Sequence, residues 1–135
     1  MAFLTKKFSA SVARAPGNSK GQGDAAEDQA LHHLQQQGLK LLQRNYRTPG
    51  RGGGEIDLVM QDRDGTLVFI EVRQRSQATH GGAAASVSRT KQARVIFAAR
   101  HYLSRWPGTP PPCRFDVVAL EQGQLHWFKA AFDSQ

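Results

Sequence analysis

Asp57 and Glu71 are acidic residues that each lie between two large aliphatic residues in the sequence. An ionised carboxylate in apolar surroundings is destabilised by several kcal/mol unless a cation or hydrogen-bond donors meet it. Each of the two carboxylates therefore needs a partner. If they lie side by side, the partner that this chemistry favours is a divalent metal ion.

The elements that carry these residues must bring them together. Two apolar, β-prone runs flank a polar turn, and the Asp64-Gly65 pair in that turn is typical of the tight connection between paired strands. We expect an antiparallel hairpin. In a hairpin that turns near this pair, Asp57 and Glu71 lie opposite each other within one register step, so their carboxylates could share one ion.

Several sequence blocks are similar to those of a known family. Residues 54–57 read Gly-Glu-Ile-Asp, and residues 71–73 give a glutamate followed two positions later by a basic residue. This pattern resembles the core of the PD-(D/E)xK nuclease superfamily and, in more detail, its YraN-like family of small bacterial proteins. The matching blocks are residues 23–34, Asn45, 54–59, 68–75, 81–91 and 114–118, so that the resemblance covers nearly everything after residue 22.

The resemblance implies a restriction-endonuclease-like α/β sandwich. Its mixed central sheet would have about five strands flanked by helices, in the order αβββαββ, which is also the order that the sequence patterns indicate. The implied site holds Mg²⁺ or Mn²⁺ through Asp57, Glu71 and the Val72 carbonyl, with Glu27 as a further ligand, because such ions prefer oxygen donors. The implied activity is metal-dependent hydrolysis of DNA phosphodiesters, by analogy with junction-cutting enzymes on branched or single-stranded intermediates of repair or recombination.

One position departs from the superfamily pattern. Arg73 stands where the superfamily has lysine, and arginine stays protonated, so it can neutralise charge but cannot readily act as a base. Simple phosphate contact or pairing with the carboxylates is an equal alternative for Arg73. We predict that Lys91 is the relocated lysine. The predicted catalytic set is Glu27, Asp57, Glu71, Arg73 and Lys91.

The first helix is predicted to begin at Asp24 and to end at Gly38. Glu27 follows Asp24 at the spacing of a capping box, which would give it a purely structural role. It also lies on the apolar stripe of residues 27, 30, 31 and 34, from which it could reach the metal site. Both roles stay open for Glu27.

Other elements are predicted from apolar periodicity and breaker residues. Strands are expected over residues 39–47, 113–120 and 124–129, and residues 76–88 are expected to form a flexible flap. The second helix should begin near Ser88 and end before Pro107. Its inward stripe reads Lys91, Val95, Ala98, Ala99, Tyr102 and Trp106. Arg114 and Asp116, two apart on one strand, are assigned to an ion pair of the scaffold.

The charge of the chain favours an acidic partner. The 135 residues include 18 Lys and Arg against 11 Asp and Glu, giving a net charge of +7. No apolar segment approaches membrane-spanning length, so nucleic acid is favoured over a membrane surface as the partner, and a role of the charge in solubility alone is an equal alternative. The resemblance implies that the nucleic acid is DNA. A basic tail over residues 1–22 and a single domain over residues 23–135 are predicted. The single cysteine excludes an internal disulfide and fits the cytoplasm. The residues expected to contact phosphates are Arg47, Arg51, Arg73, Arg75, Lys91 and Arg94.

Two other functions remain open from the sequence. The protein could be a nucleic-acid-binding module that keeps the fold without the chemistry, which Arg73 would explain. It could also be a protein-interaction or structural protein whose carboxylates pair only with Arg73, Arg75 and Arg114. If it acts as junction-cutting enzymes do, it needs two active sites, and a homodimer is then expected.

Overall fold

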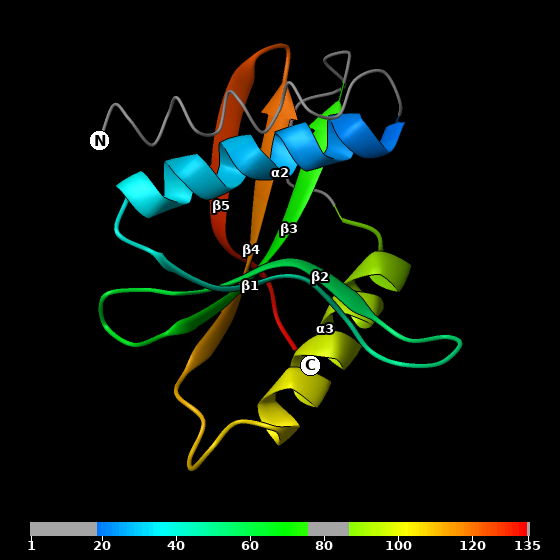
Figure 1. Ribbon diagram of the computed structural model, residues 1–135, viewed down its shortest axis with the longest axis vertical. Coiled ribbons are helices and arrows are strands. Elements are labelled where there is room, and N and C mark those ends of the chain that lie inside the picture. Colours follow the sequence, from blue (N-terminus) through cyan, green and yellow to red (C-terminus); the bar gives the residue numbers. More distant parts are fainter. Residues whose placement is uncertain (1–18, 76–86, 135) are drawn as a thin grey trace.

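The computed structural model describes residues 19–75 and 87–134 (Figure 1). Residues 1–18 of the predicted tail and most of the predicted flap lie outside these residues, as does the side chain of Arg75. Residues 19–22, which were predicted as part of the tail, lie in the first helix instead. The elements in chain order are α2 (Ser19–Gln36), β1 (Lys40–Arg47), β2 (Glu55–Gln61), β3 (Leu67–Arg75), α3 (Arg89–Ser104), β4 (Cys113–Glu121) and β5 (Gln124–Phe132). The predicted order αβββαββ is confirmed.

The five strands form one sheet in the order β1-β2-β3-β4-β5. Only β3 and β4 are parallel, and the crossover between them contains α3. The other neighbours are antiparallel, which makes the sheet mixed, as predicted. The β2–β3 hairpin is also confirmed, with Gly65 at a φ of 93° in its turn.

Two helices cover the two faces of the sheet and bury separate apolar clusters, so the α/β sandwich is confirmed (Figure 1). One cluster joins α2 to the sheet and contains Ala30, Leu31, Leu34, Leu39, Leu58, Met60, Val68, Ile70 and Val118. The other joins α3 to the opposite face and contains Tyr46, Ile56, Val59, Leu67, Phe69, Val95, Ala98, Ala99 and Phe115. The helix α3 therefore buries the stripe predicted for it.

The start of the first helix was predicted wrongly. α2 begins at Ser19, so Asp24 and Glu27 lie inside the helix and the capping-box role proposed for Glu27 is wrong. The residues just before Asp24 are polar or small and form no apolar stripe. The periodicity of apolar residues therefore could not predict that the helix begins before Asp24. The predicted end is correct, because Gly38 follows the helix with a φ of 102°, a conformation that glycine adopts without strain.

β2 and β3 part where the predicted site lies. Their register runs only from Gln61 opposite Leu67 to Leu58 opposite Ile70, whereas β3 pairs with β4 along its whole length. In Figure 1, β1 and β2 cross the view while β3 and β4 run along it, which shows how strongly the sheet twists at this point. The next residues along the two strands, Asp57 and Glu71, therefore lie where the strands open.

β5 continues past its predicted end, to Phe132. Ala130 has a φ of 51°, and its N–H donates to the Asp116 carboxylate at 2.9 Å. The buried aspartate thus holds an irregular turn of the strand that the sequence pattern does not indicate. Neither helix of the described residues is long and apolar enough to cross a membrane.

Candidate active site

Asp57 and Glu71 face each other from neighbouring strands. Extending the β2–β3 register by one pair places them opposite, and the Asp57 Oδ2 accepts a hydrogen bond of 2.8 Å from the Val72 N–H. Each carboxyl group affects the pKa of the other, so the two side chains lie close together. The two carboxylates therefore converge on one point, as the hairpin register predicts.

Glu71 is held in an environment that opposes its charge. Its side chain is only 7% exposed, and burial together with the nearby Asp57 charge raises its pKa to about 8. Its Oε1 is buried and has no hydrogen-bond partner among the described residues. Burial likewise raises the pKa of Asp57, although the Val72 N–H opposes this shift. Both carboxyl groups therefore lie where burial favours their protonated forms.

Lys91 approaches this pair from α3, whereas the two carboxylates lie on strands β2 and β3. It lies in the first turn of α3, and its N–H donates to the capping Ser88 Oγ at 3.1 Å. Its Nζ lies 3.5 Å from the Glu71 Oε2 and 3.9 Å from the Glu55 Oε2. The inward stripe of α3 thus places an ammonium group beside the carboxylate pair.

Glu27 approaches the site from α2. Burial, followed by the charge of Asp57, raises its pKa to about 7, while the Arg44 guanidinium opposes this shift. The Arg44 Nη2 lies 3.4 Å from the Glu27 Oε1, and its Nη1 lies 2.8 Å from the Asp28 Oδ1. Sequence reasoning missed Arg44 and Asp28, because nothing in the sequence links a strand residue to a helix residue sixteen positions earlier.

The donor chemistry of the site suits a hard divalent ion. Within residues 19–75 and 87–134, no three His, Cys, Asp or Glu side chains form a ready metal-binding group, and Glu27 is engaged with Arg44. Two carboxylates, a main-chain carbonyl and water nevertheless match what Mg²⁺ commonly takes. The unpartnered, buried oxygen of Glu71 is the observation that most directly fits such an ion.

Basic side chains surround the carboxylates. The guanidinium groups of Arg47 and Arg94 each lie 3.8 Å from Glu55, and Arg51 is exposed in the loop between β1 and β2. Arg73 is half-buried and lines a pocket with Glu71 and Lys91. Of the predicted phosphate-contacting residues, Arg47, Arg73, Lys91 and Arg94 thus lie beside Glu55 or Glu71.

Gly54 allows β2 and α3 to meet at this side. A Cβ on Gly54 would lie 2.0 Å from the Arg94 carbonyl oxygen and 2.9 Å from the Ala98 nitrogen. No other residue fits this approach of two backbones. The glycine therefore lets Glu55, the next residue, come within reach of Lys91 and Arg94.

Arg114 does not neutralise the site. Its ion pairs are with Asp62 at 3.1 Å and with Asp116 at 3.1 Å, away from the Asp57–Glu71 pair. The expectation that Arg114 might pair with those carboxylates is wrong. The assignment of Arg114 and Asp116 to the scaffold agrees with the structure, since Asp116 is fully buried and also accepts from the Trp127 indole at 3.0 Å.

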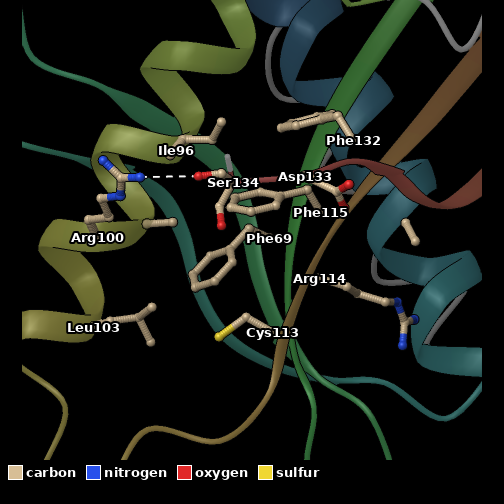
Figure 2. Close-up of a pocket in the computed structure, with 12 residues that line it drawn as sticks. Phe69, Ile96, Arg100, Leu103, Cys113, Arg114, Phe115, Phe132, Asp133 and Ser134 are labelled. Atoms are coloured by element: carbon tan, nitrogen blue, oxygen red, sulfur yellow. Dashed lines mark hydrogen bonds between the residues drawn. The ribbon is translucent and has the colours of Figure 1, made fainter.

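A second pocket, of about 530 Å³, lies between α3 and the end of β5 (Figure 2). It is larger than the pocket that Glu71, Arg73 and Lys91 line, which is about 380 Å³. Aromatic rings of Phe69, Phe115 and Phe132 line it. It contains none of the predicted site residues. Its size does not make it the candidate site, because Asp133 is the one carboxylate among the described residues that lines it.

A mixed five-stranded sheet between two helices, with one acidic side chain on each of two strands where they part, defines a PD-(D/E)xK-like protein. Residues 26–120 match the family described as Uncharacterised protein family UPF0102, and the chain belongs to that family. The predicted YraN-like resemblance is confirmed.

Relatives match most of the chain. A UPF0102 protein of Albidiferax ferrireducens is 70% identical over 118 residues, which are 87% of this chain and 91% of the relative. A UPF0102 protein of an Acidovorax species (strain JS42) is 56% identical over 135 residues and covers 99% of both chains. The UPF0102 protein Reut_A3265 of Cupriavidus pinatubonensis is 60% identical over 115 residues, 85% of this chain and 87% of its own.

Proposed function

We propose that this protein is a metal-dependent endonuclease that acts on DNA. The observation that carries the proposal is the convergence of Asp57 and Glu71 with the Lys91 ammonium 3.5 Å from Glu71. Two carboxylates and one lysine are the groups that hydrolysis of a phosphodiester at a metal centre requires.

The site residues have separate roles in this proposal. Asp57, Glu71 and the Val72 carbonyl would hold Mg²⁺ or Mn²⁺, with Glu27 able to join if it leaves Arg44. The ion, when bound, would polarise a phosphodiester oxygen and lower the pKa of a bound water. Lys91 would orient the nucleophile or neutralise charge on the phosphoryl oxygens, and Arg73 would only neutralise charge, because a guanidinium does not give up its proton.

The basic residues around the site would hold the DNA backbone. Arg47 and Arg94 lie beside Glu55, and their charge, together with that of the exposed Arg51, would attract the phosphates that the carboxylates themselves repel. Arg75 is part of this proposal from the sequence alone. A homodimer that cuts both strands of a branched substrate belongs to the same proposal.

A cleavage assay tests it. Single-stranded, duplex and branched DNA would be incubated with Mg²⁺ or Mn²⁺ and either the wild type, Glu71→Gln or Asp133→Asn. Asp133 is exposed and lies away from the carboxylate pair, so Asp133→Asn controls for the loss of a negative charge. Cleavage by the wild type and by Asp133→Asn, but not by Glu71→Gln, is the expected result.

Arg73 favours one alternative function, a nucleic-acid-binding module without cleavage. It would be supported by tight, salt-sensitive binding with no cutting under either ion. A protein that binds neither metal nor nucleic acid would instead have an interaction or structural role.

A further inference from the structure

Phe97 is an exposed aromatic side chain on α3. It is 53% exposed, and no other large hydrophobic side chain of the described residues is classed as exposed. It lies on α3, whose sixteen residues include four Lys and Arg, one His and no Asp or Glu. An exposed ring on an acid-free helix is a candidate contact for a polyanion.

The neighbours of Phe97 are cationic. Arg94 and Arg100 lie three residues before and after it, a spacing that places side chains on adjoining parts of one helix surface. Arg94 is 49% exposed and also faces Glu55 at 3.8 Å. Arg100 is exposed, and its Nη2 donates to the Ser134 carbonyl at 3.1 Å (Figure 2), which fixes its direction.

The ring lies on the same helix as Lys91, a residue of the candidate site. Lys91, which contacts Glu71, precedes Phe97 by six residues on the same helix, and this corresponds to about 9 Å along the helix axis. Arg94 lies between them. Residues 94, 97 and 100 follow Lys91 at three-residue steps, each of which turns about 60° around the helix. A nucleic-acid strand that crosses α3 obliquely along this row would therefore meet an arginine, the phenyl ring and a second arginine in succession.

We propose that Phe97 stacks on an unpaired base of the bound nucleic acid, with Arg94 and Arg100 on the neighbouring phosphates. In a duplex the base faces are covered by adjacent base pairs, so only a single-stranded segment presents a free face to a phenyl ring. This inference rests on the proposed function and narrows its substrate to DNA with a single-stranded part. A second copy of this chain is a poorer occupant, because two acid-free basic helix faces repel each other.

Binding measurements on four variants test the stacking. Fluorescently labelled oligo-dT and a labelled duplex of the same length would be titrated with wild type, Phe97→Ala, Phe97→Leu, Phe97→Trp and Thr90→Ala, in EDTA so that no cutting occurs. Thr90 is exposed on the same helix and serves as the matched control. Surface substitutions of this kind should leave the fold intact.

Loss of one base–aromatic stack predicts a weakening of about tenfold or more for oligo-dT with Phe97→Ala and Phe97→Leu. Phe97→Trp and Thr90→Ala should bind as the wild type does, and duplex binding should hardly change. Oligo-dT affinity that survives both Phe97→Ala and Phe97→Leu overturns the stacking, while loss of cleavage in Glu71→Gln would still uphold the proposed function.

Two further outcomes would also overturn the inference. A wild type that binds no nucleic acid overturns both the stacking and the proposed function. If sedimentation shows a wild-type dimer that Phe97→Ala dissociates, with DNA binding unchanged, then the ring joins two protein copies.

Discussion

The Nζ of Lys91 lies 3.5 Å from the Oε2 of Glu71, although Glu71 lies on β3 and Lys91 lies on α3, within the crossover that follows this strand. Lys91 stands on a helix, whereas the lysine of the PD-(D/E)xK pattern would stand on β3 at the position of Arg73. The ammonium group of Lys91 thus lies beside the Glu71 carboxylate, although it comes from a helix and not from β3. This relationship makes Lys91 the residue whose substitution is most informative.

Replacing Lys91 by alanine should lower DNA cleavage by two orders of magnitude or more, the loss typical of a missing group that handles a proton or charge in the transition state. Steady-state cleavage rates under saturating Mn²⁺ would measure the change. Lys40→Ala is a suitable control, because Lys40 is an exposed lysine in the first position of β1. Equal rates for the wild type and Lys91→Ala would remove Lys91 from the chemistry.

Arg73→Lys should restore cleavage to the Lys91→Ala variant, at least in part, because it returns a lysine to the position where the superfamily has one. In the wild-type background the same substitution should change the rate little. The double variant would be assayed beside both single variants on the substrate that the wild type cuts. No recovery in the double variant would mean that the two positions are not equivalent.

Glu71 should make the metal-free protein less stable as the pH rises. Burial raises its folded pKa from 4.5 to about 8, so between these values the folded state keeps a proton that the unfolded chain has released. The contribution of Glu71 to the free energy of unfolding is therefore most favourable below pH 4.5, and it is lost as the pH rises towards about 8. Glu27, with a pKa of about 7, should act in the same direction.

Urea denaturation at a series of pH values in EDTA would check this. Glu71→Gln, which resembles the protonated acid, should flatten the decline of the unfolding free energy with pH, and Asp133→Asn should not. Parallel profiles for the wild type and Glu71→Gln would contradict the raised pKa.

Asp116→Ala should destabilise the fold strongly. The carboxylate is fully buried and accepts hydrogen bonds from Arg114, from the Trp127 indole and from the Ala130 N–H. Asp62 would still pair with the Arg114 Nη1, but the Arg114 Nε, the Trp127 indole and the Ala130 N–H would lose their acceptor, a change that costs about 3–5 kcal/mol. Asp116→Asn should cost less, because an amide oxygen can still accept, and the difference is measurable by urea denaturation. A cost below about 1 kcal/mol for alanine would show that the network is replaceable.

The sequence predicted the elements whose signals are local. The Asp64-Gly65 turn fixed the hairpin register and therefore the meeting of Asp57 with Glu71, and the spacing from Ser88 to Trp106 predicted both the start of α3 and its buried face. These features follow from turn chemistry and helical periodicity, which act over a few residues.

Features that depend on distant contacts were not predictable. The pairing of Arg44 with Glu27 and Asp28 needs the crossing of α2 over β1, and the positive φ of Ala130 needs the buried carboxylate of Asp116. The close approach of Gly54 to α3 is of the same kind, because a glycine-rich stretch indicates only a loop until the helix is placed. Tertiary packing determines such contacts, and patterns of neighbouring residues in the sequence do not predict it.

The central claim is that Asp57 and Glu71 share one divalent ion, and a crystal structure obtained with Mn²⁺ tests it most directly. The account predicts an anomalous-scattering peak bound by carboxylate oxygens of both residues, and no peak there in Glu71→Gln crystals treated in the same way. Wild-type crystals without such a peak at saturating Mn²⁺, with Lys91 still paired to Glu71, would contradict it.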